Sequence, residues 1–216
     1  MIGASALLEV WPWLTVTGLG AFHGLDPGMG WLFAVALGLY RRDRRIVWLA
    51  LVPIALGHTV SVAAVALVLL WVGWFVDGWA VRVGAALLLL GWALYHWRFR
   101  HRHRVRFGMR VGLTGLFVWS FLMAAAHGAG LMLWPALMPL CLPNGAATAP
   151  ASASLAAGLA GVGLHTLAML SVTAAIAAAV YEWIGVQVLR KAWLNIDALW
   201  VTTLLATGML MLANTF

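Results

Sequence analysis

Five ionisable side chains stand inside stretches of the sequence that are otherwise apolar. They are four histidines and one aspartate: His23, Asp26, His58, His127 and His165. A charged side chain in the hydrocarbon of a membrane costs roughly 2.5–3.5 kcal/mol on the insertion scale, so such residues mark candidate functional sites. Imidazole and carboxylate suit Ni, Co, Zn, Cu or Fe rather than Ca or Mg. We therefore predict that the five residues form a metal site; for each histidine alone, the alternative is a hydrogen bond across helices.

The rest of the chain has the composition of a membrane protein. Its 216 residues are 64% hydrophobic and 9% charged, whereas soluble domains are about 45–50% apolar and about 25% charged. We predict an all-α, polytopic protein with one membrane domain (residues 1–216), in the plasma membrane of a bacterium (the inner membrane). The net charge of +7 comes from basic residues in short loops, which indicates topology and not nucleic-acid binding. The lipid bilayer is the expected partner, and the sequence leaves open whether the protein forms a homo-oligomer.

Six apolar runs are long enough to cross a membrane as helices. They cover about residues 14–40, 46–72, 79–97, 111–138, 154–181 and 193–213. Forty helical residues would measure about 60 Å, which is too long for one crossing. Residues 1–12 are therefore expected outside the hydrocarbon core. Gly and Pro around His23 and Asp26 also permit a helix break within the first span.

The basic residues predict which side of the membrane each loop faces. Three alternate loops, 41–45, 98–110 and 190–191, hold four, six and two of the thirteen Lys and Arg residues. Cytoplasmic loops carry such an excess of positive charge. The three basic loops are therefore predicted in the cytoplasm and both termini outside.

The two halves of the sequence resemble each other. Matching dipeptides recur 104 and 107 residues apart: His23-Gly24 with His127-Gly128, and His58-Thr59 with His165-Thr166. This spacing indicates duplication of a three-helix unit, with repeats at about 14–97 and 111–213. Because three is odd, the second copy enters the membrane from the opposite side, which gives the inverted repeat of many secondary transporters.

Two motifs resemble a known family. His23 to Met29 (HGLDPGM) looks like the HxxDxDH signature of the nickel/cobalt permease superfamily, and Leu56 to Val60 (LGHTV) resembles its second-helix LGH[ST]xV motif. The resemblance implies a six-helix permease for nickel or cobalt, with His23, Asp26 and His58 at the metal site.

The chain departs from the signature at two positions. Gly28 and Met29 stand where the family has Asp and His. His127 and His165 are candidates to replace the missing ligands. The thioether of Met29 is a further candidate, although methionine commonly fills gaps in apolar packing.

Five other polar positions lie near the ends of the predicted spans or in the loops between them. Asp197 and Arg82, near the ends of the sixth and third spans, are candidate gate or coupling residues, or they snorkel to water. His96, in or beside the Arg-rich loop with His101 and His103, is interpreted as part of a topology determinant.

Three classes of function fit these features. The first is a secondary transporter of a transition-metal cation (Ni, Co, Zn or Cu), which is not an enzyme. The second is a haem protein with two axial histidines, which a Soret band would reveal. The third is an exporter of a small solute without metal. An intramembrane metalloenzyme ranks last, because the sequence has no HExxH motif.

Overall fold

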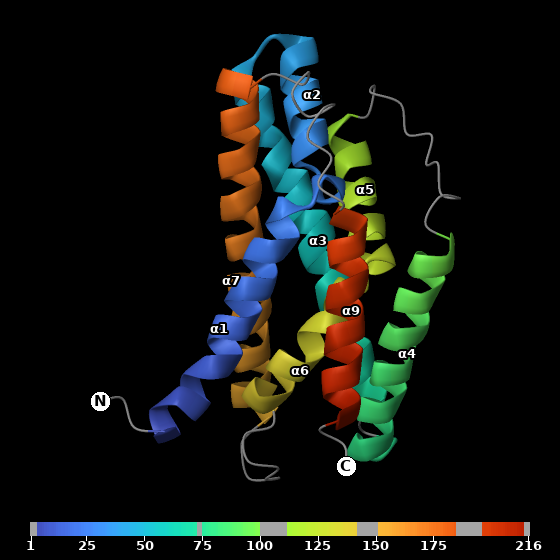
Figure 1. The fold of residues 1–216 in the computed structure, drawn as a ribbon. Helices are drawn as coiled ribbons and strands as arrows, with labels where there is room; N and C mark the ends of the chain where they lie inside the picture. The colour runs from blue at the N-terminus through green and yellow to red at the C-terminus, as the bar shows by residue number, and fades with distance from the viewer. Residues whose placement is uncertain (1–3, 73–74, 100–111, 142–150, 185–195, 214–216) are drawn as a thin grey trace.

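The computed structural model describes residues 4–72, 75–99, 112–141, 151–184 and 196–213, and all regular structure in these ranges is helical (Figure 1). The elements are α1 (Ala4–Leu25), the 3₁₀ turn η1 (Pro27–Met29), α2 (Trp31–Arg41), α3 (Arg44–Val72), α4 (Gly78–Phe99), α5 (Leu113–Ala126), α6 (Ala129–Cys141), α7 (Ala151–Ala179), the π-helical turn η3 (Val180–Ile184) and α9 (Ile196–Ala213). The all-α prediction is confirmed.

Several of these helices are long and apolar enough to cross a membrane. Among the described residues they are Arg44–Leu69, Gly78–Arg98 and Leu155–Trp183, with the bent pair α5 and α6 as a fourth if it counts as one span. The first three match the second, third and fifth predicted spans, and the bent pair matches the fourth. The first predicted span is divided into α1 and α2, and the apolar part described in α9, Val201–Ala213, is short. The length and composition of three to four described helices suit a membrane protein, and six spans stay a prediction.

The first predicted span breaks at Asp26, and Pro27 is the reason. A residue before proline is disfavoured in the helical region, and Asp26 is extended with φ −69° and ψ 122°. Its side chain accepts a hydrogen bond from the Gly28 N–H (2.7 Å), which caps the short η1 turn. Gly30 then has a φ of +120°, a value that residues other than glycine rarely adopt. The permitted helix break is confirmed, and α1 begins at Ala4, earlier than the predicted span.

The fourth predicted span breaks at its own histidine–glycine pair. His127 ends α5, Gly128 takes a φ of +68°, and α6 leaves at an angle of 67° to α5. Thus the two His-Gly dipeptides that the sequence pairs, at 23 and 127, both lie at or beside helix breaks.

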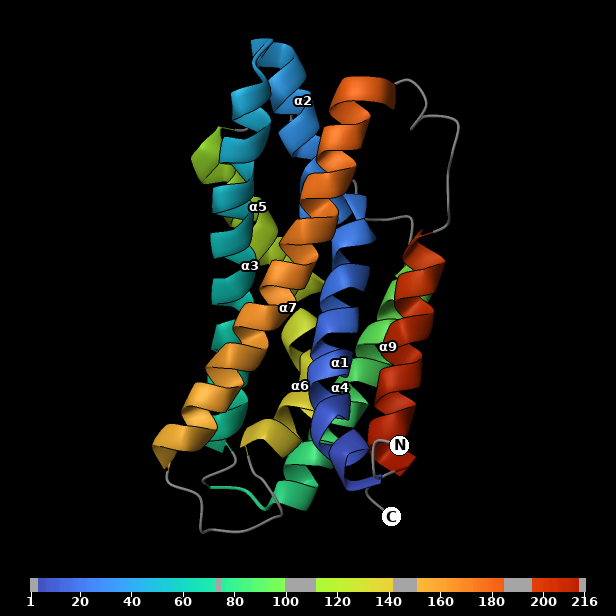
Figure 2. The ribbon, with the colours of Figure 1, turned by 90° about the vertical axis from the view of Figure 1, so that its left-hand side faces the viewer.

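Three extensive helix pairs build the bundle: α1 with α7, α3 with α5, and α4 with α9 (Figures 1 and 2). In both views α2 and α6 lie toward opposite ends of the bundle, so α1–α2 and α5–α6 run in opposite directions. Apolar clusters fill the contacts among these helices; one of them joins α4, α6 and α9 around the buried Leu89, Trp134 and Leu204.

Candidate functional site: a buried histidine cluster

Three histidines from three helices meet in the interior of the bundle. His23 comes from α1, His58 from α3 and His165 from α7, and all three are fully buried. The ring centres are 5.0 Å apart for His23 and His165, 5.4 Å for His58 and His165, and 5.7 Å for His23 and His58. Imidazoles that bind one metal ion through bonds of about 2.0–2.1 Å have ring centres roughly 5 Å apart. The three rings are therefore close enough to contact one cation.

Close helix packing brings the three histidines together. Gly20 lies directly against the carbonyl of His165, and Gly57 against the carbonyl of Phe117, where a Cβ would overlap the backbone of the neighbouring helix. Small residues let membrane helices approach closely. The hydroxyl of Thr59 also meets that of Thr166 at 3.3 Å, across α3 and α7. The two His-Thr dipeptides of the predicted repeat thus lie side by side.

Hydrogen bonds to α1 fix how two of the rings are protonated. Nδ1 of His23 lies 2.8 Å from the carbonyl oxygen of Leu19, and Nδ1 of His165 lies 3.1 Å from that of Val16. A carbonyl oxygen only accepts hydrogen bonds, so each neutral ring carries its proton on Nδ1. The Nε2 atoms then bear the lone pairs. This is the arrangement in which a second-shell carbonyl orients a metal-binding histidine.

His58 differs from the other two rings. Both of its nitrogens are buried without a hydrogen-bond partner, as is Nε2 of His165. Buried polar groups are hydrogen-bonded in the large majority of cases. The unsatisfied nitrogens of His58 therefore need an explanation, such as a ligand that binds there.

The rings do not form a ready three-ligand metal site. No group of three or more His, Cys, Asp or Glu side chains in the described part of the chain is arranged to hold a metal ion. Ring orientation accounts for this, because His58 and His165 are stacked at 14°. The lone pair of an imidazole nitrogen lies in the ring plane, so the lone pairs of stacked rings do not converge. His23 stands edge-on to both, at 70° and 74°, and a pair that includes His23 suits two-ligand binding better.

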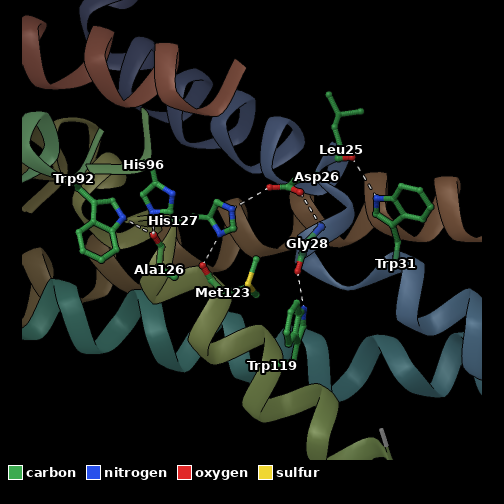
Figure 3. Close-up of polar contacts among 10 residues, drawn as sticks. All are labelled: Leu25, Asp26, Gly28, Trp31, Trp92, His96, Trp119, Met123, Ala126 and His127. Atoms are coloured by element: carbon green, nitrogen blue, oxygen red, sulfur yellow. Dashed lines mark hydrogen bonds and ion pairs between the residues drawn. The ribbon is translucent and has the colours of Figure 1, made fainter. Parts of the chain in front are cut away.

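Asp26 and His127 form a separate pair. Oδ2 of Asp26 lies 3.5 Å from Nε2 of His127, whose Nδ1 lies 2.8 Å from the carbonyl of Met123 (Figure 3). Asp26 does not share a helix face with His23, because α1 ends at Leu25 and the backbone turns before Pro27. The five predicted residues thus divide into a cluster of three and a pair.

The Asp26–His127 pair joins the two helix breaks. Trp119 of α5 donates from Nε1 to the carbonyl of Gly28 at 2.9 Å, beside the pair (Figure 3). A Cβ on Gly28 would lie 2.9 Å from the methyl group of Met123. The break between α1 and α2 is therefore held against the end of α5 by a polar pair and a backbone hydrogen bond.

His96 belongs to this region, although the sequence analysis interprets it as part of a basic loop. It lies in the last turns of α4, its Nε2 is 3.2 Å from the carbonyl of Ala126, and its ring centre is 6.3 Å from that of His127. Trp92 donates to the same carbonyl (Figure 3). The signal was present, because His96 falls inside the predicted span 79–97.

The remaining candidates lie elsewhere. Met29 is fully buried in η1. Arg82 turns back along α4, with Nε 3.3 Å from the carbonyl of Gly78, as a residue near a helix end does. Asp197 lies in the first turn of α9, and its side chain is outside the described residues.

No protein-family model matches the chain, and it matches no curated protein and no solved structure. The resemblance to nickel/cobalt permeases therefore stays a prediction from two sequence motifs. Because function belongs to sites and not to folds, the buried histidine cluster is the basis for a functional proposal.

Proposed function

We propose that the protein is a secondary permease that moves a transition-metal cation through the cluster of His23, His58 and His165. The observation that carries the proposal is the pair of unsatisfied, fully buried nitrogens of His58, in contact with two other buried imidazoles. An unsatisfied buried polar group costs about 1–3 kcal/mol. A cation that binds the acceptor nitrogen of His58 during transport would satisfy that atom.

The proposed architecture is an inverted repeat of two three-helix units. In it, α1–α2 corresponds to α5–α6, α3 to α7, and α4 to α9. If the two units are exchanged, the α1–α7 pair becomes the α5–α3 pair, and the α4–α9 pair stays the same. These three helix pairs are also the ones in extensive contact in the bundle. The two helix breaks also correspond. In this architecture the two units rock about the central cluster, and the Asp26–His127 pair is a candidate gate because it joins the breaks.

The proposed topology has six spans, both termini outside and the basic loops in the cytoplasm of a bacterial cell. Single cysteines at Arg45 and Gly78, both exposed at helix starts, test it in a Cys141→Ser background. A membrane-impermeant maleimide added to intact cells (after outer-membrane permeabilisation) is expected to label the Gly78→Cys protein and not the Arg45→Cys protein. The reverse pattern would contradict the orientation, and equal labelling would contradict the placement of these ends on opposite sides.

The cluster fits a cation better than haem. Two axial histidines bind haem iron from opposite faces of the porphyrin. Here the rings contact one another edge-on or stacked, with centres 5.0–5.7 Å apart. Such contacts leave no space between the rings for the macrocycle.

Transport into proteoliposomes tests the proposal. Purified protein is reconstituted, and uptake of Ni(II), Co(II), Zn(II) and copper is followed with a metal-sensitive dye in the lumen. We expect protein-dependent uptake of at least one cation, its loss in His58→Phe, and its retention in Gly84→Ala, a change in open space on α4 away from the cluster and the helix breaks. Absence of uptake for every cation, or equal uptake by the His58→Phe protein, would contradict the proposal.

A further inference from the structure

The ligands that surround the proposed cation are electrically neutral. The chain has six acidic residues, and the structure describes the side chains of four. Three lie at helix ends, where they accept backbone hydrogen bonds or pair with an arginine: Asp43, Asp77 and Glu182. The fourth, Asp26, accepts from Gly28 and faces His127. Each of these four carboxylates therefore contacts a group that is not one of the three clustered histidines.

A neutral, buried ligand set discriminates between cations by charge. The cost of moving an ion from water into a low-dielectric interior grows with the square of its charge, so it is about four times larger for a divalent than for a monovalent cation. Carboxylate or thiolate ligands compensate for that charge at many divalent sites, and at a site of three histidines a bound water that loses a proton does so. Three fully buried imidazoles supply nitrogen donors and no compensating charge.

The geometry of the donors also favours a low coordination number. The stacked rings of His58 and His165 do not direct lone pairs to one point, whereas His23 is edge-on to each. Met169 lies fully buried one turn along α7 from His165, and its backbone adjoins Gly24 next to His23. A thioether is a soft ligand that selects Cu(I), and imidazole also suits copper, whereas oxygen ligands suit hard cations.

We infer that the cargo of the His23–His58–His165 cluster is a soft monovalent cation of the Cu(I) and Ag(I) class and not a divalent one. The inference rests on the proposed function and specifies its substrate. Two of the three imidazoles bind the ion at a time, and His23 is the common partner. Divalent Ni, Co and Zn are disfavoured because none of the four described carboxylates belongs to the cluster.

Equilibrium binding to the purified full-length chain tests the inference. The protein carries Cys141→Ser, because a thiol would itself bind soft cations, and the measurement is made without oxygen in detergent. Ag(I), Cu(I), Ni(II), Co(II) and Zn(II) are each titrated against a chelator of known affinity. We expect one Ag(I) or Cu(I) per chain, bound at least about 100-fold more tightly than the divalent ions. The His58→Phe change is expected to weaken binding about 10-fold or more, and His96→Phe to leave it unchanged.

Each other outcome has a defined meaning. Tighter His58-dependent binding of Ni(II), Co(II) or Zn(II) would overturn the monovalent inference and leave the proposed permease standing. Failure of every cation to bind would overturn both. An Asp26→Asn protein that loses Ag(I) affinity as strongly as His58→Phe would show a carboxylate at the site and overturn the neutral ligand set. Equal losses in His58→Phe and His96→Phe would show that the cluster is not the binding site.

Discussion

Replacing His58 by phenylalanine should stabilise the protein while removing its proposed function. A neutral imidazole has one donor and one acceptor nitrogen, and both are buried without partners in His58. Each unsatisfied buried group costs about 1–3 kcal/mol, and replacement by an apolar group of similar shape removes that cost. Some of the gain is lost to the slightly larger ring. We therefore expect a net gain of about 1–3 kcal/mol in the free energy of unfolding.

The matched comparison is His165→Phe. His165 is equally buried, but its Nδ1 is hydrogen-bonded to the carbonyl of Val16 at 3.1 Å. Its replacement leaves that carbonyl without this partner, which is expected to offset the gain at Nε2 or to destabilise by about 1 kcal/mol. The two variants thus make the same side-chain change and differ in the expected change in stability.

Thermal unfolding in metal-free detergent distinguishes them. The fourteen tryptophans provide an intrinsic fluorescence signal. For a chain of this size 1 kcal/mol shifts Tm by about 2–4 °C, so His58→Phe should unfold several degrees above His165→Phe. If His58→Phe lowers Tm as much as His165→Phe does, the nitrogens of His58 have partners in the folded protein, and the reasoning is refuted.

Three further predictions concern helix packing and the breaks. The Cβ of Gly57→Ala would overlap the α5 backbone, so this change should lower the free energy of unfolding by about 1–3 kcal/mol in a thermal unfolding experiment. Gly84→Ala has open space around it and should be neutral or stabilising. Equal effects would contradict the close packing. Cysteines at Thr59 and Thr166, whose hydroxyls are 3.3 Å apart, should cross-link under mild oxidation, and a failure to do so would contradict the contact of α3 with α7. Asp26→Asn keeps an acceptor for the η1 turn and loses the charge facing His127; we expect a changed transport rate at a cation affinity within about 3-fold of the original, because only the gate is altered.

Sequence periodicity identified the cluster better than it identified the partners of each residue. The His-Thr repeat matches His58 with His165 in the sequence, and their rings are in contact. Asp26 lies apart from the cluster because α1 ends at Leu25 and the chain turns before Pro27. The contact of the Asp26 carboxylate with His127 depends on the second helix break at Gly128, which no local pattern reveals.

The charge pattern of the sequence also concealed one residue. His96 stands two residues before Arg98 in an Arg-rich stretch, and composition there favours a solvated loop. The structure instead directs its ring toward Ala126 and His127. Which way a histidine near a helix end points is decided by the neighbouring helix, and this information is tertiary.

The most direct test of the buried histidine cluster is X-ray absorption spectroscopy on the purified protein loaded with Cu(I), in the Cys141→Ser background. The spectrum reports the atoms bound to the metal and their distances. We predict imidazole nitrogens at about 2 Å in the original protein and their reduction or loss in His58→Phe. A spectrum without imidazole scattering, or one that is the same in the His58→Phe protein, would contradict the assignment of this cluster as the cation site.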